Sequence, residues 1–164
     1  MATRNLTGPE IMNLGGALQA LMATDIKGSV RFNYAATRTK KVVQPEIDSM
    51  KENAQPSEPF REYDKLRVDL CKEFCSKDQA GNPVQKEGGD FVFEDAGREK
   101  FEAAMVVLKE EHKEALKGEM VHREELNRVF SEPKEITIYE VALEEFPELP
   151  LNMFDALSPM IKED

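Results

Sequence analysis

The stretch "KDQAGNPVQKEGGDFVFED", residues 77 to 95, interrupts a chain that is otherwise rich in charged and helix-forming residues. Its first part, "DQAGNP", is dense in turn-forming residues, and Gly88 and Gly89 separate two short β-prone segments, "VQKE" and "DFVFE". Asp95 can cap a helix that follows. We therefore expect residues 77 to 95 to reverse the direction of the chain and to form a β-hairpin.

Amphipathic helical patterns flank this reversal on both sides. Apolar residues recur at spacings of three and four in "SEPFREYDKLRVDLCKEFCSK" before it and in "REKFEAAMVVLKEEHKEALK" after it. The two stripes consist of Tyr63, Leu66, Leu70 and Phe74, and of Phe101, Ala104, Met105, Leu108, His112 and Ala115. The patterns predict two helices that pack against each other in antiparallel directions.

The rest of the chain supplies further helices and one strand. Thr7 and Glu10 have capping-box spacing at the start of the first helix, and Pro45 predicts a kink in the second, near residues 41 to 45. The alternating segment "EITIYEVAL", residues 135 to 143, predicts a strand that pairs with the hairpin at residues 82 to 94. The expected elements are an N-terminal helix over 7–23, a kinked long helical arm over 30–76, the turn and β-hairpin over 77–95, a return helix over 96–131, and a strand plus short C-terminal helix over 135–164.

Length and composition set the class of protein. A chain of 164 residues with 40% hydrophobic residues is long enough for one domain, which we expect to span residues 1 to 164. The predicted fold is mainly α with a small β element: an elongated antiparallel helical bundle or hairpin, capped by a two- or three-stranded antiparallel sheet. Because no apolar run is long enough for a membrane span and no signal-peptide pattern opens the chain, we expect a soluble, intracellular protein.

The net charge of −10 is unevenly distributed along the chain. Residues 1 to 50 hold six Lys and Arg against four Asp and Glu, whereas the remaining chain holds sixteen against twenty-eight. Such a polarised charge can orient self-assembly or steer a basic partner to the acidic end. The overall acidity disfavours ordinary nucleic-acid binding through phosphate neutralisation.

The sequence offers few residues for chemistry. Cys71 and Cys75 lie four apart on a predicted helix, where we expect free thiols, and Glu119 and His122 form an E-x-x-H spacing that occurs in metal-binding bundles. A metal site would need further ligands at the right spacing, and no nucleophile elbow or phosphate-binding loop occurs. We therefore expect no catalytic residues, no cofactor and no bound metal.

Three groups of residues are candidate partner-binding surfaces. The basic stripe could contact nucleic acid or an acidic neighbour, or be a solvated face. The acidic group could meet a basic partner, although adjacent acids usually mark a solvated face. The two phenylalanines could contact a partner or close the end of the helical pair. The groups are Arg31, Arg38, Lys40 and Lys41; Phe91 and Phe93; and Glu144, Glu145 and Glu148.

The order of several short motifs resembles a family of short, functionally uncharacterised proteins from tailed bacteriophages, over about residues 30 to 164. The matching residues are Pro45, Glu46 and Ile47; Lys77, Asp78, Gly81, Asn82, Pro83 and Val84; Lys100, Phe101 and Met105; and Leu149, Pro150, Leu157, Pro159 and Ile161. Two segments depart from the pattern, "AQPSEPF" with its two prolines and "MVHREELNRVFSEPK", which resembles an insertion. The resemblance implies a phage origin and carries over no catalytic residue.

Three hypotheses for the function follow. In the first, the chain is a phage structural or assembly component whose basic N-terminal third meets the acidic C-terminal region of a neighbouring subunit. In the second, it is an acidic inhibitor that occupies the nucleic-acid-binding groove of a host or defence enzyme. The third is a metalloenzyme built on Glu119 and His122. The partners would be proteins, in the host bacterial cytoplasm or the virion. We expect neither membrane association nor direct nucleic-acid binding, and the chain could form a homo-oligomer.

Overall fold

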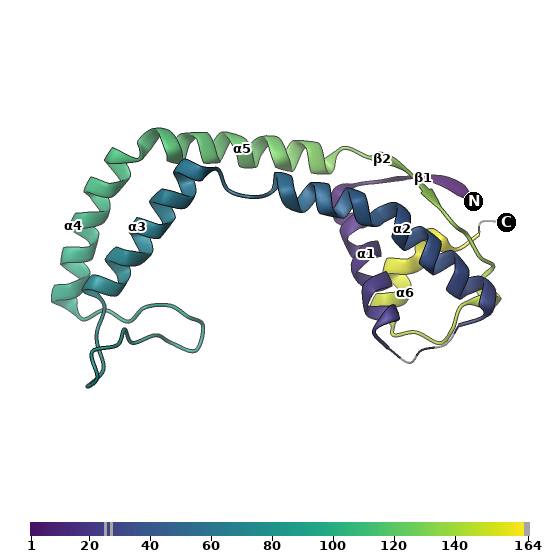
Figure 1. Cartoon of the computed structure of the whole chain (residues 1–164), viewed down its shortest axis with the longest axis horizontal. Helices are drawn as coiled ribbons and strands as arrows, with labels where there is room; N and C mark the ends of the chain where they lie inside the picture. The colour runs from purple at the N-terminus through teal and green to yellow at the C-terminus, as the bar shows by residue number, and fades with distance from the viewer. Residues whose placement is uncertain (25, 27, 163–164) are drawn as a thin grey trace. The chain divides into compact units, whose positions relative to one another are not determined.

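A computed structural model describes residues 1–24, 26 and 28–162, and its chain is mainly helical with a small antiparallel sheet, as the sequence predicted (Figure 1). The single domain expected from the sequence contains two compact units. Unit 1 comprises Met1–Gln55 and Glu124–Asp164, and unit 2 comprises Pro56–Arg123. Lys27, in the basic N-terminal region, and the end of the expected segment 135–164 lie outside the described residues.

The first two helices of unit 1 begin at the residues that the sequence indicates. Helix α1 spans Gly8–Met22, and the Glu10 carboxylate accepts hydrogen bonds from the backbone N–H and the hydroxyl of Thr7, both at 2.7 Å. Helix α2 spans Val30–Asn53 and begins after Ser29, whose hydroxyl oxygen accepts a hydrogen bond from the Phe32 N–H at 3.0 Å. Pro45 lies inside α2, and the helix continues through it.

The sheet of unit 1 pairs the N-terminal strand with a strand that follows α5. Strand β2, Lys134–Ile138, lies where the sequence predicted a strand, but it pairs antiparallel with β1, Ala2–Leu6, in a register that sets Ala2 opposite Ile138. The expected pairing with residues 82–94 is therefore wrong. That segment uses its backbone groups locally, because the Val84 N–H donates to the Ser76 carbonyl and the Val92 N–H donates to the Val84 carbonyl.

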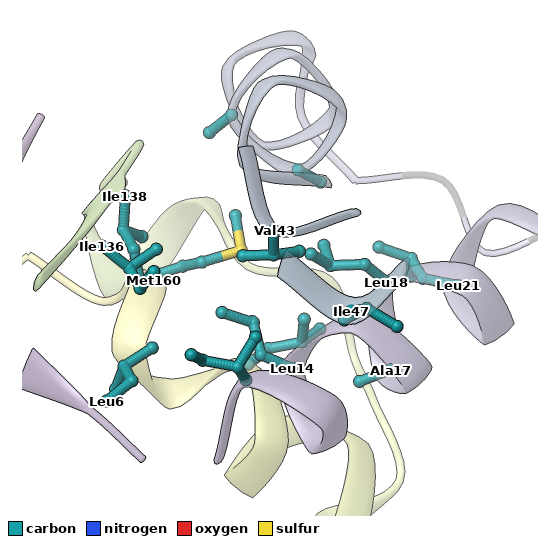
Figure 2. Close-up of a cluster of buried hydrophobic side chains, with 14 of the residues drawn as sticks. Leu6, Leu14, Ala17, Leu18, Leu21, Val43, Ile47, Ile136, Ile138 and Met160 are labelled. Atoms are coloured by element: carbon teal, nitrogen blue, oxygen red, sulfur yellow. The ribbon is translucent and has the colours of Figure 1, made fainter. Parts of the chain in front are cut away.

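A hydrophobic core fills unit 1 and draws on helices, strands and the C-terminal segment (Figure 2). This segment contains the short helices η1 (Leu143–Glu145), α6 (Leu151–Leu157) and η2 (Ser158–Met160). The buried cluster of unit 1 comprises Leu6, Ile11, Leu14, Ala17, Leu18, Leu21, Phe32, Ala35, Ala36, Val43, Ile47, Met50, Ile136, Ile138, Val141, Leu157 and Met160. Gly15 lets α1 approach α2 closely, because a Cβ there would lie 2.0 Å from the Cδ1 of Ile47.

Unit 2 is built on an antiparallel helical hairpin, as the sequence predicted. Helix α3 spans Glu58–Phe74 and helix α4 spans Asp95–Glu111, and the two pack side by side (Figure 1). Gly97 at the start of α4 lies against the end of α3 at Phe74, whereas the rings of Tyr63 and His112 meet at the other end, 5.9 Å apart. Their buried cluster consists of Tyr63, Met105 and Leu108.

The helical segments before and after the reversal each consist of two helices. The arm expected over residues 30–76 contains α2, which ends at Asn53, and α3, which begins at Glu58, as its two separate helical patterns indicate; between them "QPSEP" places Gln55 before a proline, where helical backbone is disfavoured. The return helix over residues 96–131 breaks at His112, whose φ of −106° and ψ of 21° leave the helical region. Helix α5, Lys113–Ser131, follows, and the boundary between the two units falls within it.

All the long helices carry charged residues among their apolar ones. Helices α3 and α4, for example, pair an apolar face with exposed acids and bases such as Asp69, Lys72 and Glu110. Among the residues that the structure describes, no helix combines the length and the apolar composition needed to cross a bilayer.

Candidate interaction surfaces

Three members of the predicted basic stripe share one exposed face of α2. Arg31, Arg38 and Lys41 fall within a narrow arc at the helical period of 3.6 residues, and each is exposed. Lys40 lies on the opposite side of the helix, where its ammonium donates a hydrogen bond to the Gln19 side chain on α1. The basic surface of α2 therefore consists of three residues rather than four, and helical periodicity alone separates Lys40 from the others.

Two tyrosine rings contact the guanidinium of Arg38. The Cζ of Arg38 lies 5.6 Å from the ring centroids of both Tyr34 and Tyr139, and the two rings meet edge to face at 6.3 Å. Tyr139 is fixed in turn by its backbone N–H, which donates to the buried Thr39 hydroxyl at 3.1 Å. Arg38 thus has a packing role on the surface of unit 1 in addition to its charge.

The basic and acidic parts of the chain meet within unit 1. The Arg31 guanidinium lies 3.4 Å from the Glu145 carboxylate, although the Arg31 side chain is 83% exposed, so water screens this pair. Glu144 and Glu148, the other predicted acidic residues, are exposed. Arg31 and Glu145 also line a cavity of about 550 Å³ together with Tyr34, Tyr139 and Lys162. The structure therefore brings together one residue of each predicted charged group.

The two cysteines are buried free thiols, as the sequence predicted. Burial raises the pKa of the Cys71 thiol, so this side chain remains protonated at neutral pH. The Cys75 thiol donates a weak hydrogen bond to the Lys72 carbonyl at 3.5 Å. Both thiols are therefore packed inside unit 2.

Glu119, half of the E-x-x-H spacing, is 5% exposed and makes structural contacts in unit 2. Its carboxylate accepts a hydrogen bond from the Arg123 Nε at 2.9 Å and one from the Ser57 backbone N–H at 3.4 Å. Because Ser57 is the N-cap residue of α3, Glu119 ties the start of α3 to α5. Within residues 1–24, 26 and 28–162, no three His, Cys, Asp or Glu side chains gather in an arrangement that could bind a metal ion.

The reversal at residues 77–95 consists of two tight turns. Gly81 and Gly89 each have a φ of +84°, a left-handed conformation that glycine adopts without steric cost. The Asp78 carboxylate accepts hydrogen bonds from the backbone and side-chain amides of Asn82, which lower its pKa below the usual range of an aspartate. Isolated bridges join Lys77 to Pro83 and Gln85 to Phe91.

The two predicted phenylalanines of this reversal are both half-buried. The ring of Phe93 packs on that of Phe101 in α4, with centroids 4.9 Å apart. Phe91 takes part in the bridge to Gln85 at the base of the second turn. Phe93 therefore contributes to the packing of the hairpin itself.

A groove between α3 and α4 is the surface that the sequence analysis missed. Its volume is about 530 Å³. It is lined by the apolar residues Leu66, Leu70, Ala104, Val107 and Leu108, and by the acidic residues Asp69, Glu73 and Glu111. Four of these residues, Leu66, Leu70, Ala104 and Leu108, belong to the predicted interior stripes, but Leu66 is 38% exposed, so its predicted interior position is wrong. Val107 lies outside those stripes.

No protein-family model matches the chain, and no curated protein or solved structure matches it either.

Proposed function

We propose that this chain is a non-catalytic protein of a tailed bacteriophage that acts through protein–protein contacts, as a structural or assembly component of the virion. The observation that carries the proposal is the partly uncovered apolar face of the helical hairpin in unit 2. The hairpin buries a cluster of only three residues while Leu66 and Val107 remain exposed beside it. Apolar area left in water on one face of a hairpin favours association with another protein.

The phage assignment rests on the motif order described above, in which the "KDQAGNPV" turn leads into the hairpin's second helix. The chain would then act in the host bacterial cytoplasm during assembly, or remain in the particle. Exposed Lys41 on α2 and exposed Glu144 and Glu148 support a version in which basic and acidic surfaces of neighbouring subunits meet, whereas Arg31 and Glu145 pair within one chain.

Two measurements on the phage test this proposal. Mass spectrometry of purified virions and of assembly intermediates should detect the chain, and deletion of its gene should lower the yield of complete particles. A chain that is absent from both preparations, together with normal assembly after deletion, would reject the structural role.

A second candidate function is an acidic inhibitor of a host or defence enzyme. Glu144 and Glu148 support it, because both are exposed in a segment that is rich in acids. Glu145 already pairs with Arg31, so reversing Glu144 and Glu148 to Lys is a sharper test than reversing all three. Affinity capture from infected host extract should enrich one host protein with the wild-type chain and lose it with the double reversal. Equal enrichment by both chains would reject this function.

A further inference from the structure

We propose that the groove between α3 and α4 binds a cationic amphipathic helix of another polypeptide. This inference rests on the proposed function, because it names the chemistry of the protein partner. It concerns one face of unit 2 and none of the charged residues that the sequence singled out.

The groove has the form that a third helix requires. Its lining comes from one row on each helix, at positions i, i+3, i+4 and i+7. The rows are Leu66, Asp69, Leu70 and Glu73 on α3, and Ala104, Val107, Leu108 and Glu111 on α4. Two such rows side by side form the ridges between which the apolar residues of a further helix pack.

The floor of the groove is apolar and only partly covered by the hairpin itself. Leu66 is 38% exposed and Val107 is 56% exposed, whereas Leu108 beneath them is 7% exposed. The apolar stripe of a helix placed here would cover Leu66 and Val107 and extend the small cluster around Leu108. A partner with an i, i+3, i+4, i+7 apolar pattern therefore fits the floor.

The rim of the groove selects the charge of the partner. Asp69, Glu73 and Glu111 are all exposed carboxylates. Asp69 has one cation nearby, Lys72 at 3.8 Å, but both side chains are more than half exposed, so the pair is screened. Lys or Arg residues beside the apolar stripe of the partner would face these carboxylates.

The same rim argues against a second copy of this chain as the occupant. If two hairpins packed groove to groove, Asp69, Glu73 and Glu111 of one copy would face the same carboxylates of the other. Like charges at such an interface suppress association. The occupant is therefore a basic helix from a different polypeptide.

The test uses the full chain and a synthetic peptide. The probe is a fluorescein-labelled amphipathic peptide of about 18 residues, long enough for roughly five helical turns. It carries a Leu stripe flanked by Lys, and a matched peptide carries the same stripe flanked by Glu. At about 0.15 M salt, fluorescence anisotropy should show that the Lys-flanked peptide binds at least about tenfold more tightly than the Glu-flanked one.

Two valines supply a matched pair of variants for the same assay. Val107→Glu places a carboxylate on the floor of the groove and should weaken binding of the Lys-flanked peptide by about tenfold or more, because its apolar stripe would bury that charge. Val106→Glu changes a neighbouring residue that is 70% exposed and does not line the groove, so binding should change by less than about twofold. Circular dichroism confirms that both variants remain helical.

Several outcomes would overturn the inference. These are equal binding of the two peptides, equal effects of Val107→Glu and Val106→Glu, or a wild-type dimer that Val107→Glu dissociates and the Lys-flanked peptide does not. Each leaves the proposed function standing if the chain is still found in particles or assembly intermediates. Conversely, if the chain proved to play no part in assembly, groove-specific binding of the Lys-flanked peptide would still support this inference.

Discussion

Unit 1 and unit 2 differ most in how much of their apolar surface they bury themselves. Among the residues that the structure describes, the cluster in unit 1 contains seventeen buried hydrophobic residues contributed by helices, a sheet and a C-terminal segment. The cluster in unit 2 contains three, all from the α3–α4 hairpin and its surroundings. A hairpin of two helices leaves one side of each apolar stripe open, whereas unit 1 closes its core from several directions. Unit 1 therefore provides its own stability, and unit 2 presents a surface.

This difference has consequences for dynamics. Segments with few buried apolar contacts open locally at lower free energies than a closed core. We expect α3 and α4 to be the less stable part of the free protein. The following predictions test or refine this contrast between the units.

The largest expected effect is in the core of unit 1. Phe32→Ala removes a ring that is fully buried and meets Phe146 edge to face at 4.9 Å, and should cost about 3–5 kcal/mol of unfolding free energy. Because the chain has no Trp, urea unfolding is best followed by far-UV circular dichroism. The control Val30→Ala, at a residue that is 87% exposed, should change the unfolding free energy by less than about 0.5 kcal/mol. A loss for Phe32→Ala no larger than for Val30→Ala would contradict the assignment of the core.

The next effect concerns the contact between α3 and α4 in unit 2. A Cβ on Gly97 would lie 2.4 Å from the Phe74 backbone oxygen, so Gly97→Ala should force the helix ends apart and cost about 1–3 kcal/mol. Gly118→Ala is the matched control on α5, where a Cβ meets nothing within 4 Å and should instead stabilise the helix by up to about 1 kcal/mol. Urea unfolding of both variants checks these opposite signs; two changes of the same sign would count against the hairpin geometry.

A smaller effect is expected where α5 holds the start of α3. Glu119→Gln removes the charge that accepts hydrogen bonds from Arg123 and from the Ser57 N–H, and should destabilise the protein by about 1–2 kcal/mol. Glu114→Gln changes an exposed residue of the same helix and should be neutral within about 0.5 kcal/mol. Thermal unfolding of the two variants makes the comparison. If Glu119→Gln changed the stability as little as Glu114→Gln, the contacts of Glu119 would not stabilise unit 2.

The smallest effect is the pH dependence of the reversal between α3 and α4. The Asn82 amides lower the pKa of the Asp78 carboxyl in the folded protein. Asp78 therefore stabilises the turn fully at pH values above the pKa that the same carboxyl has in the unfolded chain. That contribution is lost as the pH falls through the lowered, folded-state pKa. An NMR titration from about pH 6 to about pH 2 should move the amide signals of Ala80 and Asn82 as Asp78 protonates. Asp78→Asn should remove this titration; amide shifts that persist in the variant would assign them to another group.

Much of the helical structure could be predicted from local signals. The Thr7–Glu10 spacing and the glycine-rich reversal each act over a few residues, and the structure places the start of α1 and the turn between α3 and α4 accordingly. Apolar periodicity also identified the facing stripes of α3 and α4. These features depend on neighbours in the sequence, which is why sequence patterns reveal them.

Long-range pairing was the part that could not be predicted. Strand β1 has the sequence "ATRNL", with one large apolar residue, Leu6, and its pairing with β2 depends on a shared core rather than on β-propensity. The division of the return helix at His112 likewise has no proline or glycine to announce it. The groove was missed because Val107 lies outside the stripe that was used to assign the interior.

Hydrogen exchange of the full chain, measured by mass spectrometry with and without the Lys-flanked peptide, tests most directly the claim that the groove face of the α3–α4 hairpin is an uncovered apolar surface. The account predicts that α3 and α4 exchange faster than α1 and α2 in the free protein, and that the peptide slows exchange in α3 and α4 alone. Equal protection of the four helices in the free protein, or peptide-induced protection in α1 and α2, would contradict it.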